Sequence, residues 1–339
     1  MTDLLLYFLT FAFAVFITAA SLPYLRKCLA SRLADAPTAL KNHQGIIPAV
    51  GGCAVALGFF ASLTFIRLIT AFPTGTLKNL RGLFIGGAII FAAGLIDDIK
   101  KPAGLPPFVK LSFQFLAAVI LINYDIRIQF AQQPWGDILT VLWICGLTNA
   151  LNLIDIMDGL AVSQAALGAA TFAIISLPSE YIYVNFAAAT LLGTCIGFWP
   201  YNHSKKLKTF LGDSGSNLLG FLLAALALGT SYSATNPLAV FVPLIILALP
   251  IFDTIFVSIA RISKGISPLR GSPDHFPLRI ERLGFTRNQI LILCICAALV
   301  YDALAYFIIK NGLLISVIIY ALVFLDLLIF AAFLMRSEK

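Results

Sequence analysis

The chain has little charge. Only 12% of its 339 residues are Asp, Glu, Lys or Arg, whereas 60% are hydrophobic and the mean hydropathy is +0.95. Soluble domains carry about a quarter charged residues, so the composition excludes a soluble globular protein. Lys and Arg outnumber Asp and Glu by 23 to 16. Because no compact basic domain exists to hold a nucleic acid, that class of partner is excluded as well.

The six cysteines show none of the paired spacings that bind metal ions. We therefore expect small buried hydrophobic side chains rather than ligands or disulfides. The first apolar run is long and lacks a basic segment before it, which favours a retained span over a cleavable signal peptide. No connector is long enough to hold a soluble domain. We expect a single transmembrane domain over residues 1–339.

Apolar runs long enough to cross a bilayer recur along the whole chain. They predict an all-α integral membrane protein, a polytopic helical bundle with about eleven transmembrane helices of roughly 20 residues each. The runs cover residues 4–25, 49–71, 80–97, 107–123, 137–154, 159–177, 181–200, 213–231, 237–259, 290–309 and 313–335.

Lys and Arg are concentrated in alternate connectors, and basic residues stay on the cytoplasmic side of a membrane. The predicted cytoplasmic loops are therefore 26–48, 97–107, 149–160, 201–213 and 260–289. An odd number of spans then places the N-terminus outside and the C-terminus in the cytoplasm.

Four polar residues end the fifth apolar run at intervals of three: Asn149, Asn152, Asp155 and Asp158. A three-residue step keeps side chains on one slowly drifting stripe of a helix. A carboxylate near the bilayer centre costs on the order of 2.5–3.5 kcal/mol, and less at the end of a span. We favour a functional cluster over the alternative, an ordinary interfacial helix end.

Further acidic residues end or begin other spans. Asp97 and Asp98 are adjacent, and two such carboxylates stay ionised only beside a cation or water. Hard divalent cations take carboxylate oxygens as ligands, so the pair is a candidate cation site. The alternative is that both carboxylates lie at a solvated helix end and bind nothing. Lys110 would either hold a phosphate or extend toward the membrane surface. Asp213, in G-D-S-G-S, would lie at a helix start whose free amides suit an anion, or would be a plain N-cap.

The longest cytoplasmic loop brings Asp274, His275, Arg279 and Arg282 together. Arginine forks bind phosphate oxygens, and Asp274 would orient the His275 ring. The alternative is a basic loop that only sets topology. Acidic clusters suit a cation and basic clusters suit phosphates, and all lie on one predicted face. This combination predicts phosphoryl transfer, in which a metal ion offsets the repulsion between two anionic reactants.

The chain resembles the polyprenyl-phosphate N-acetylhexosamine-1-phosphate transferases, glycosyltransferase family 4, over nearly its whole length. The resemblance rests on five motifs in this order: D-x-P-x-x-x-K-x-H at 35–43 with P-x-x-G-G at 48–52, D-D-I-K at 97–100, N-A-L-N-L-I-D-I-M-D-G-L at 149–160, G-D-S-G-S at 212–216 and D-H-F-P-L-R-I-E-R-L-G at 274–284.

The resemblance implies transfer of a sugar-1-phosphate from a UDP-N-acetylhexosamine to undecaprenyl phosphate, with release of UMP, at the inner membrane of a bacterium. Asn152 and Asp213 would hold Mg²⁺, with Mn²⁺ as the alternative ion. The candidate catalytic residues are Asp97, Asp98, Asp213 and His275, of which the first two would bind and activate the lipid phosphate. The candidate substrate-binding residues are Lys41, Lys110, Asn149, Asn152, Asp155, Asp158, Arg279 and Arg282. A homodimer is the assembly that such families favour.

Three departures from the family pattern bear on these roles. Leu278 occupies the place of the second histidine that relatives with the form D-H-x-S-H-R carry. Ile156 follows Asp155 where relatives carry Gly, which puts the role of Asp155 in question. The three-histidine run of the muramoyl-pentapeptide transferase branch is absent, so UDP-GlcNAc or a deoxy-sugar relative is the expected donor. The product would begin O-antigen, capsule, teichoic acid or another surface glycan. A membrane transporter of a sugar phosphate or anion is the alternative function, although charges at span ends and the lack of a repeat argue against it.

Overall fold

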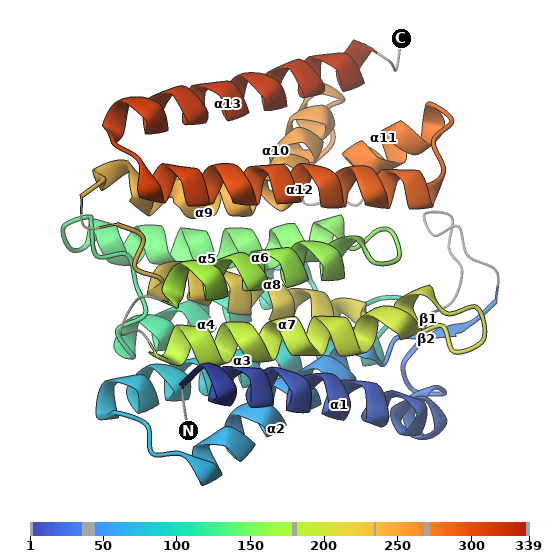
Figure 1. Cartoon of the computed structure of the whole chain (residues 1–339). Coiled ribbons are helices and arrows are strands. Elements are labelled where there is room, and N and C mark those ends of the chain that lie inside the picture. Colours follow the sequence, from blue (N-terminus) through green and yellow to red (C-terminus); the bar gives the residue numbers. More distant parts are fainter. Residues whose placement is uncertain (1–2, 36–44, 178–181, 234, 268–271, 337–339) are drawn as a thin grey trace. The chain divides into compact units, whose positions relative to one another are not determined.

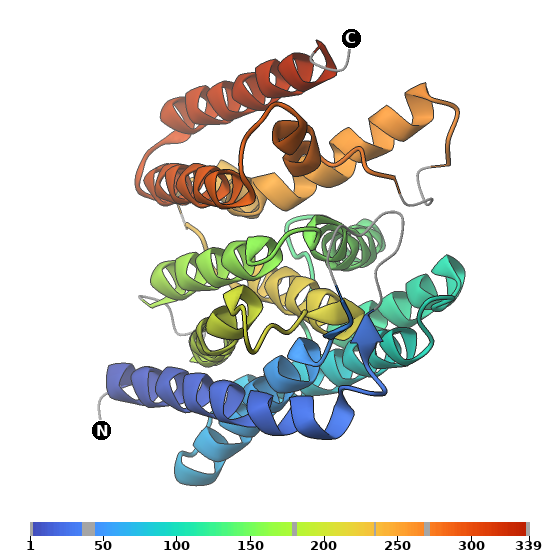
Figure 2. The same cartoon turned by 90° about the vertical axis from the view of Figure 1, so that its right-hand side faces the viewer.

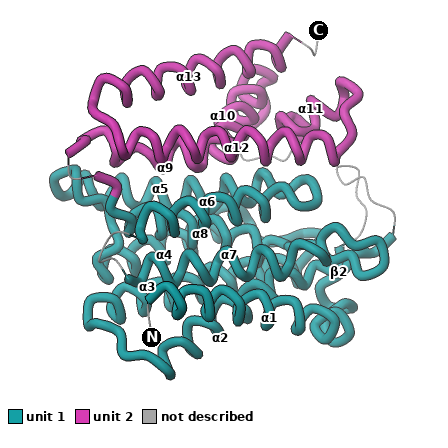
Figure 3. The backbone as a smooth tube through the Cα atoms, viewed as in Figure 1, with its two compact units in different colours: residues 1–231 teal, residues 232–339 magenta. Residues whose placement is uncertain are grey.

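The computed structural model describes residues 3–35, 45–177, 182–233, 235–267 and 272–336. The chain divides into two compact units, residues 1–231 and 232–339 (Figure 3), and each is described by itself. Helices make up nearly all of the described secondary structure (Figure 1).

The described residues of the first unit form the helices α1 (Asp3–Leu29), α2 (Gly51–Ile69), α3 (Thr74–Ile99), α4 (Pro107–Asn123), α5 (Trp135–Ile154), α6 (Leu160–Ser176), α7 (Ile182–His203) and α8 (Gly212–Gly229) (Figure 1). Proline precedes the first residue of α3, α4 and α5, at Pro73, Pro106 and Pro134. Between α1 and α2, β1 (Ala34–Asp35) pairs antiparallel with β2 (Ile47–Pro48).

Helix α8 is the central helix of this unit. Nearly every residue from Ser214 to Ala227 is buried, because the helix contacts α2, α3, α5, α6 and α7 (Figure 2). A helix that is apolar on all sides is stable only inside such a bundle. Its polar residues are confined to the first turns, Asp213 to Asn217. The packing therefore fixes a polar helix start at one end of an apolar core.

Two glycines allow the neighbouring helices to approach the start of α8. A Cβ atom on Gly94 of α3 would lie 2.5 Å from the Cα atom of Ser214, and one on Gly52 of α2 would lie 2.3 Å from the backbone nitrogen of Gly215. The backbone N–H of Gly52 also donates to the carbonyl of Leu211 at 2.8 Å. The glycines of the P-x-x-G-G motif are therefore packing residues that hold α2 against G-D-S-G-S.

The second unit contains η1 (Pro237–Phe241), α9 (Val242–Ile246), α10 (Ala248–Ser263), α11 (Phe276–Arg282), α12 (Arg287–Lys310) and α13 (Leu313–Arg336). The segment Pro237–Ile246 meets α10 at an angle of 71°. The run 237–259, predicted as one continuous span, is therefore a broken one. Asn236 stabilises its beginning, since its amide donates to the carbonyls of Ile308 and Asn311 and its Oδ1 accepts from the N–H of Leu238.

The other ten predicted runs each overlap a single helix, which confirms an all-α membrane protein. Among the described residues, seven helices are long and apolar enough to cross a membrane, or eight if the broken pair is one span. Helices α4 and α6 are shorter apolar helices. The total of eleven spans and the orientation of the termini stay predictions.

We expect Gly94→Ala to destabilise the protein, because the added methyl group would meet the backbone of Ser214 and force α3 away from α8. Overpacking of this kind costs about 1–3 kcal/mol. Thermal unfolding in detergent should show a lower Tm than the wild type. Gly146→Ala on α5 is the matched control, since nothing lies within 4 Å of the added Cβ. Equal Tm values for the two variants would contradict the packing described here.

Candidate active site

Five charged side chains of the first unit form a contiguous group, here called the charged cluster: Asp97 and Asp98 at the end of α3, Lys101, Lys110 on α4 and Asp213 on α8. Lys110 Nζ lies 2.8 Å from an oxygen of Asp97 and 2.8 Å from one of Asp213. Lys101 Nζ lies 2.7 Å from Asp98 and 3.0 Å from Asp213. The sequence predicted that D-D-I-K and G-D-S-G-S share one site, and the structure brings these two motifs together.

Asp98 caps the start of α8. Its Oδ1 accepts the backbone N–H of Asp213 at 2.9 Å and the Lys101 ammonium at 2.7 Å. Its Oδ2 accepts the backbone N–H of Ser214 at 2.9 Å and the Ser214 hydroxyl at 2.7 Å. A carboxylate has about four acceptor sites, so these bonds use all of them. Asp98 therefore satisfies amides that a helix start leaves without a helical partner.

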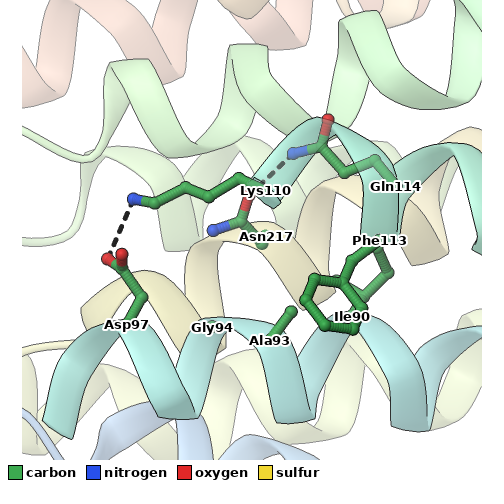
Figure 4. Close-up of a pocket in the computed structure, with 8 residues that line it drawn as sticks. All are labelled: Ile90, Ala93, Gly94, Asp97, Lys110, Phe113, Gln114 and Asn217. Carbon is green, nitrogen blue, oxygen red and sulfur yellow. Dashed lines mark hydrogen bonds and ion pairs between the residues drawn. The ribbon is translucent and has the colours of Figure 1, made fainter. Parts of the chain in front are cut away.

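Asp97 faces a different environment. Its Oδ1 accepts the N–H of Leu105 at 2.5 Å and its Oδ2 accepts the Lys110 ammonium at 2.8 Å. Figure 4 shows Asp97 and Lys110 paired at one end of a pocket between α3, α4 and α8. The rest of the lining combines apolar side chains with two amides: Ile90, Ala93, Gly94, Phe113, Gln114 and Asn217. Asp97 and Lys110 thus form the charged end of a largely apolar pocket.

Asp213 is the most accessible carboxylate of the charged cluster. Its side chain is 17% exposed, against 3% for Asp97 and 0% for Asp98. Both of its described ion pairs are to lysines. Asp213 is therefore the carboxylate of the charged cluster that is most open to solvent.

Lys101 was not among the predicted site residues. Burial lowers the pKa of Lys101, but the carboxylates of Asp213 and Asp98 outweigh this effect and raise it above its ordinary value. The ammonium group is therefore charged at neutral pH. The sequence contains a signal for this contact. Lys101 lies three residues after Asp98 in D-D-I-K-K, and side chains three residues apart are neighbours on a helix.

The polar stripe at the end of α5 is shorter than the sequence predicted. The helix ends at Ile154, so Asn149 and Asn152 lie on it but Asp155 and Asp158 do not. Asp155 has φ −76° and ψ 54°, and the N–H of Ile156 donates to the carbonyl of Ile154 at 2.8 Å. This is an inverse γ-turn, which ends the helix. The prediction of one helical stripe was therefore wrong beyond Asn152.

The two asparagines of α5 have different partners. Asn152 Oδ1 accepts the Ser216 hydroxyl at 2.6 Å, and Ser216 lies about one helical turn after Asp213. Asn149 instead donates to Gln114 of α4 at 2.6 Å and to the carbonyl of Cys145 at 2.8 Å. Asn152 is therefore adjacent to the charged cluster, whereas the Asn149 amide ties α5 to α4.

The turn after α5 extends the site. Burial raises the pKa of Asp155 to about 7, the nearby carboxylates of Asp213, Asp158 and Asp98 add to the rise, and Lys101 opposes it. The charges of the cluster therefore act on Asp155. Asp158 pairs with Lys208 at 2.5 Å, in the connector between α7 and α8.

In the second unit, His275 is oriented by a residue that the sequence did not single out. Its Nδ1 lies 2.6 Å from Oδ2 of Asp253 on α10. The prediction that Asp274 orients the ring was wrong, because Asp274 pairs with Lys264 at 2.5 Å and with Arg279 at 3.3 Å. Burial raises the pKa of Asp274, but these partners outweigh it and hold the pKa below its ordinary value.

The arginines of the same loop also have partners. Arg279 is buried, donates to the carbonyl of Leu334 at 3.2 Å and lies over the ring of Phe256 at 4.7 Å. Arg282 is exposed and donates to the carbonyl of Pro273 at 2.5 Å. Lys41 lies outside the described residues.

Comparison with known proteins gives a consistent result. The family model described as "Glycosyl transferase family 4" matches residues 80–231, which include the whole charged cluster. The "Probable undecaprenyl-phosphate N-acetylglucosaminyl 1-phosphate transferase" of Bacillus subtilis is 31% identical over 271 residues, covering 76% of this chain and 73% of the relative. The "Undecaprenyl-phosphate alpha-N-acetylglucosaminyl 1-phosphate transferase" of Escherichia coli K12 is 29% identical over 290 residues, covering 78% and 74%.

We expect Asp98→Ala to unfold at a lower temperature than Asp98→Asn, and Asp98→Asn lower than the wild type. Alanine leaves two buried N–H groups of α8 without an acceptor, at a cost of about 1–3 kcal/mol. Asparagine keeps one acceptor oxygen and caps helices nearly as well as aspartate. Thermal unfolding of the three purified proteins checks the order. If Asp98→Ala matched the wild type, Asp98 would not be holding α8.

Proposed function

Because the chain belongs to glycosyl transferase family 4, we propose that this membrane enzyme transfers N-acetylglucosamine-1-phosphate from UDP-N-acetylglucosamine to undecaprenyl phosphate and releases UMP. The names of its relatives support both the lipid acceptor and the sugar phosphate. Membership in this family also decides against the transporter that the sequence left open.

The observation that carries the proposal is the charged cluster. Both reactants are anionic, and a phosphate monoester carries about −1.5 to −2 charges at pH 7. The cluster places two ammonium groups, Lys101 and Lys110, among three carboxylates within 3.0 Å. Its formal charge is −1, so it can accept a further cation while its lysines turn to phosphate oxygens. This is the balance of charge that phosphoryl transfer requires.

The donor chemistry of the cluster suits Mg²⁺. Among the residues that the structure describes, no group of three or more His, Cys, Asp or Glu side chains could hold a metal ion alone. Mg²⁺ does not need one, because it is usually bound by one or two carboxylates, substrate phosphates and waters. Asp213 would hold it, with the amide oxygen of Asn152 as a second ligand, and Mn²⁺ is the alternative ion. Once bound, the ion would offset charge on the bridging phosphate oxygens.

In the proposed reaction, an oxygen of the lipid phosphate forms a bond to the β-phosphorus of the sugar nucleotide. The bond from that phosphorus to the bridging oxygen breaks, and its electron pair leaves with UMP. Lys110 binds a phosphate oxygen from the pocket, and Asp97 holds Lys110 in place. Asp155 and Asp158 lie beyond the end of α5, where we place the nucleotide.

The pocket in Figure 4 is also suited to an amphipathic acceptor. Ile90, Ala93 and Phe113 line it next to Lys110. A phosphate bound at Lys110 could therefore leave its prenyl chain against apolar side chains. We place this site at the cytoplasmic face of a bacterial inner membrane, where the product would begin a surface glycan.

The proposal predicts that purified protein will release UMP from UDP-N-acetylglucosamine only when undecaprenyl phosphate and Mg²⁺ are both present. EDTA should abolish release, and added Mg²⁺ should restore it. A panel of UDP-sugars assayed in the same way identifies the donor. UMP release that does not require the lipid, or no release with any UDP-N-acetylhexosamine, would contradict the proposed reaction.

We expect Asp213→Asn to lower kcat by at least about a hundredfold, a loss of roughly 2.7 kcal/mol of transition-state stabilisation. The physical reason is that an amide replaces the charged ligand of a hard cation. The UMP assay at saturating Mg²⁺ provides the measurement. Asp137→Asn is the matched control, because Asp137 lies at the start of α5 and pairs with Arg127. Unchanged turnover in Asp213→Asn would remove Asp213 from the metal site.

A further inference from the structure

Asp253 is a buried carboxylate in an apolar helix. Its side chain is 0% exposed, and it lies in the sequence P-I-F-D-T-I-F of α10. A buried ionised carboxylate costs several kcal/mol unless its oxygens are hydrogen-bonded. Such a residue within an apolar segment of a membrane protein indicates a function, and its partner identifies the function.

Both oxygens of Asp253 contact the loop that carries His275. Oδ2 lies 2.6 Å from Nδ1 of His275, and Oδ1 accepts the backbone N–H of Phe276 at 3.0 Å. The carboxylate therefore binds two consecutive residues at the point where α11 begins. This arrangement fixes the rotation of the His275 ring as well as its position.

Aromatic packing holds the same two segments together. The ring of Phe252, next to Asp253, lies 5.7 Å from that of Phe276, next to His275. Both rings contact Phe330 of α13, at 5.4 and 5.8 Å. The Asp253–His275 contact is therefore supported by a cluster of three phenylalanines and does not depend on a flexible surface loop.

The charged neighbours of His275 have other partners. Asp274 pairs with Lys264 and Arg279, and Arg279 also donates to the carbonyl of Leu334. Asp253 is thus the carboxylate that contacts the imidazole among the described residues. An ionised carboxylate only accepts hydrogen bonds, so Nδ1 must carry the proton. The 2.6 Å separation is shorter than that of an ordinary N–H···O bond, as is expected when the bond is charge-assisted.

We propose that Asp253 is a positioning residue that keeps Nδ1 of His275 protonated as part of an imidazolium and fixes the ring, so that Nε2–H donates to an anionic phosphate oxygen of a substrate. This inference rests on the proposed function, in which both reactants carry anionic phosphate oxygens. No net proton transfer is needed, since the attacking group is a phosphate oxygen. With Asp253 as counter-ion, the imidazolium carries a positive charge that stabilises negative charge on the phosphate oxygen bound at Nε2.

The substitution Asp253→Asn tests the pairing directly. Asparagine can still accept the N–H of Phe276 through its oxygen, but its amide group would then donate to Nδ1 and select the Nε2–H tautomer. The neutral ring would still donate from Nε2, but it would lose the positive charge that the Asp253 carboxylate stabilises. We expect at least a tenfold fall in kcat, with little change in the KM for UDP-N-acetylglucosamine. Asp326→Asn is the matched control, because Asp326 is exposed and pairs with Tyr301.

The decisive readout is ¹⁵N NMR of histidine-labelled protein. The chain has three histidines, so His275→Gln assigns the signal. The proposal requires a protonated Nδ1 in the wild type and in Asp326→Asn, and an unprotonated Nδ1 in Asp253→Asn. An unprotonated Nδ1 in the wild type would overturn it, even if Asp253→Asn did not fold. A folded Asp253→Asn protein with wild-type kcat would overturn it as well.

The same experiments separate this inference from the function on which it rests. If wild-type protein releases no UMP with any donor, the proposed reaction fails, and the NMR signals alone still test the pairing. If the wild type is active and Asp253→Asn loses activity with the expected tautomer, both stand. If the wild type is active and the tautomer does not change, only the role of Asp253 fails.

Discussion

The contact on which the rest of the first unit depends is the one between Asp98 and the start of α8. One buried carboxylate accepts two backbone N–H groups, a serine hydroxyl and a lysine ammonium. These bonds offset the cost of burying its charge, which would otherwise amount to several kcal/mol. They also join α3 to the central helix of the bundle. Since Asp213 donates one of these N–H groups, its position follows from the same contact.

Around this anchor the protein keeps more charge than stability would require. Asp97, Lys101, Lys110 and Asp213 could each be replaced by apolar residues in a bundle built only for stability, because buried ion pairs rarely stabilise more than apolar packing does. Departures of this kind from otherwise consistent packing are typical of functional sites. The charges of the cluster sum to −1, so a cation and a phosphate can bind without leaving a large net charge in the site.

Much of this could be predicted from the sequence, and the failures share one physical cause. Apolar length predicted the helices, and the motifs singled out Asp97, Asp213 and Asn152, which the structure places in or next to the charged cluster. The γ-turn at Asp155 could not be predicted, because the three-residue spacing of the polar side chains is compatible with a continued helix. Asp253 was missed because its partner lies 22 residues away, and only tertiary structure brings them together. Local patterns predict elements, whereas the choice of partner for a buried charge depends on the fold.

The two buried carboxylates share a structural role but differ in chemistry. Asp98 and Asp253 each accept a backbone N–H at the start of a helix and so place a functional residue beside it, Asp213 or His275. A backbone N–H needs only an acceptor, which an amide oxygen also supplies. An imidazole responds to the kind of partner it has, since a donor facing Nδ1 reverses the tautomer. The charge of Asp98 therefore matters mainly for holding helices, whereas the charge of Asp253 determines the state of the group beside it.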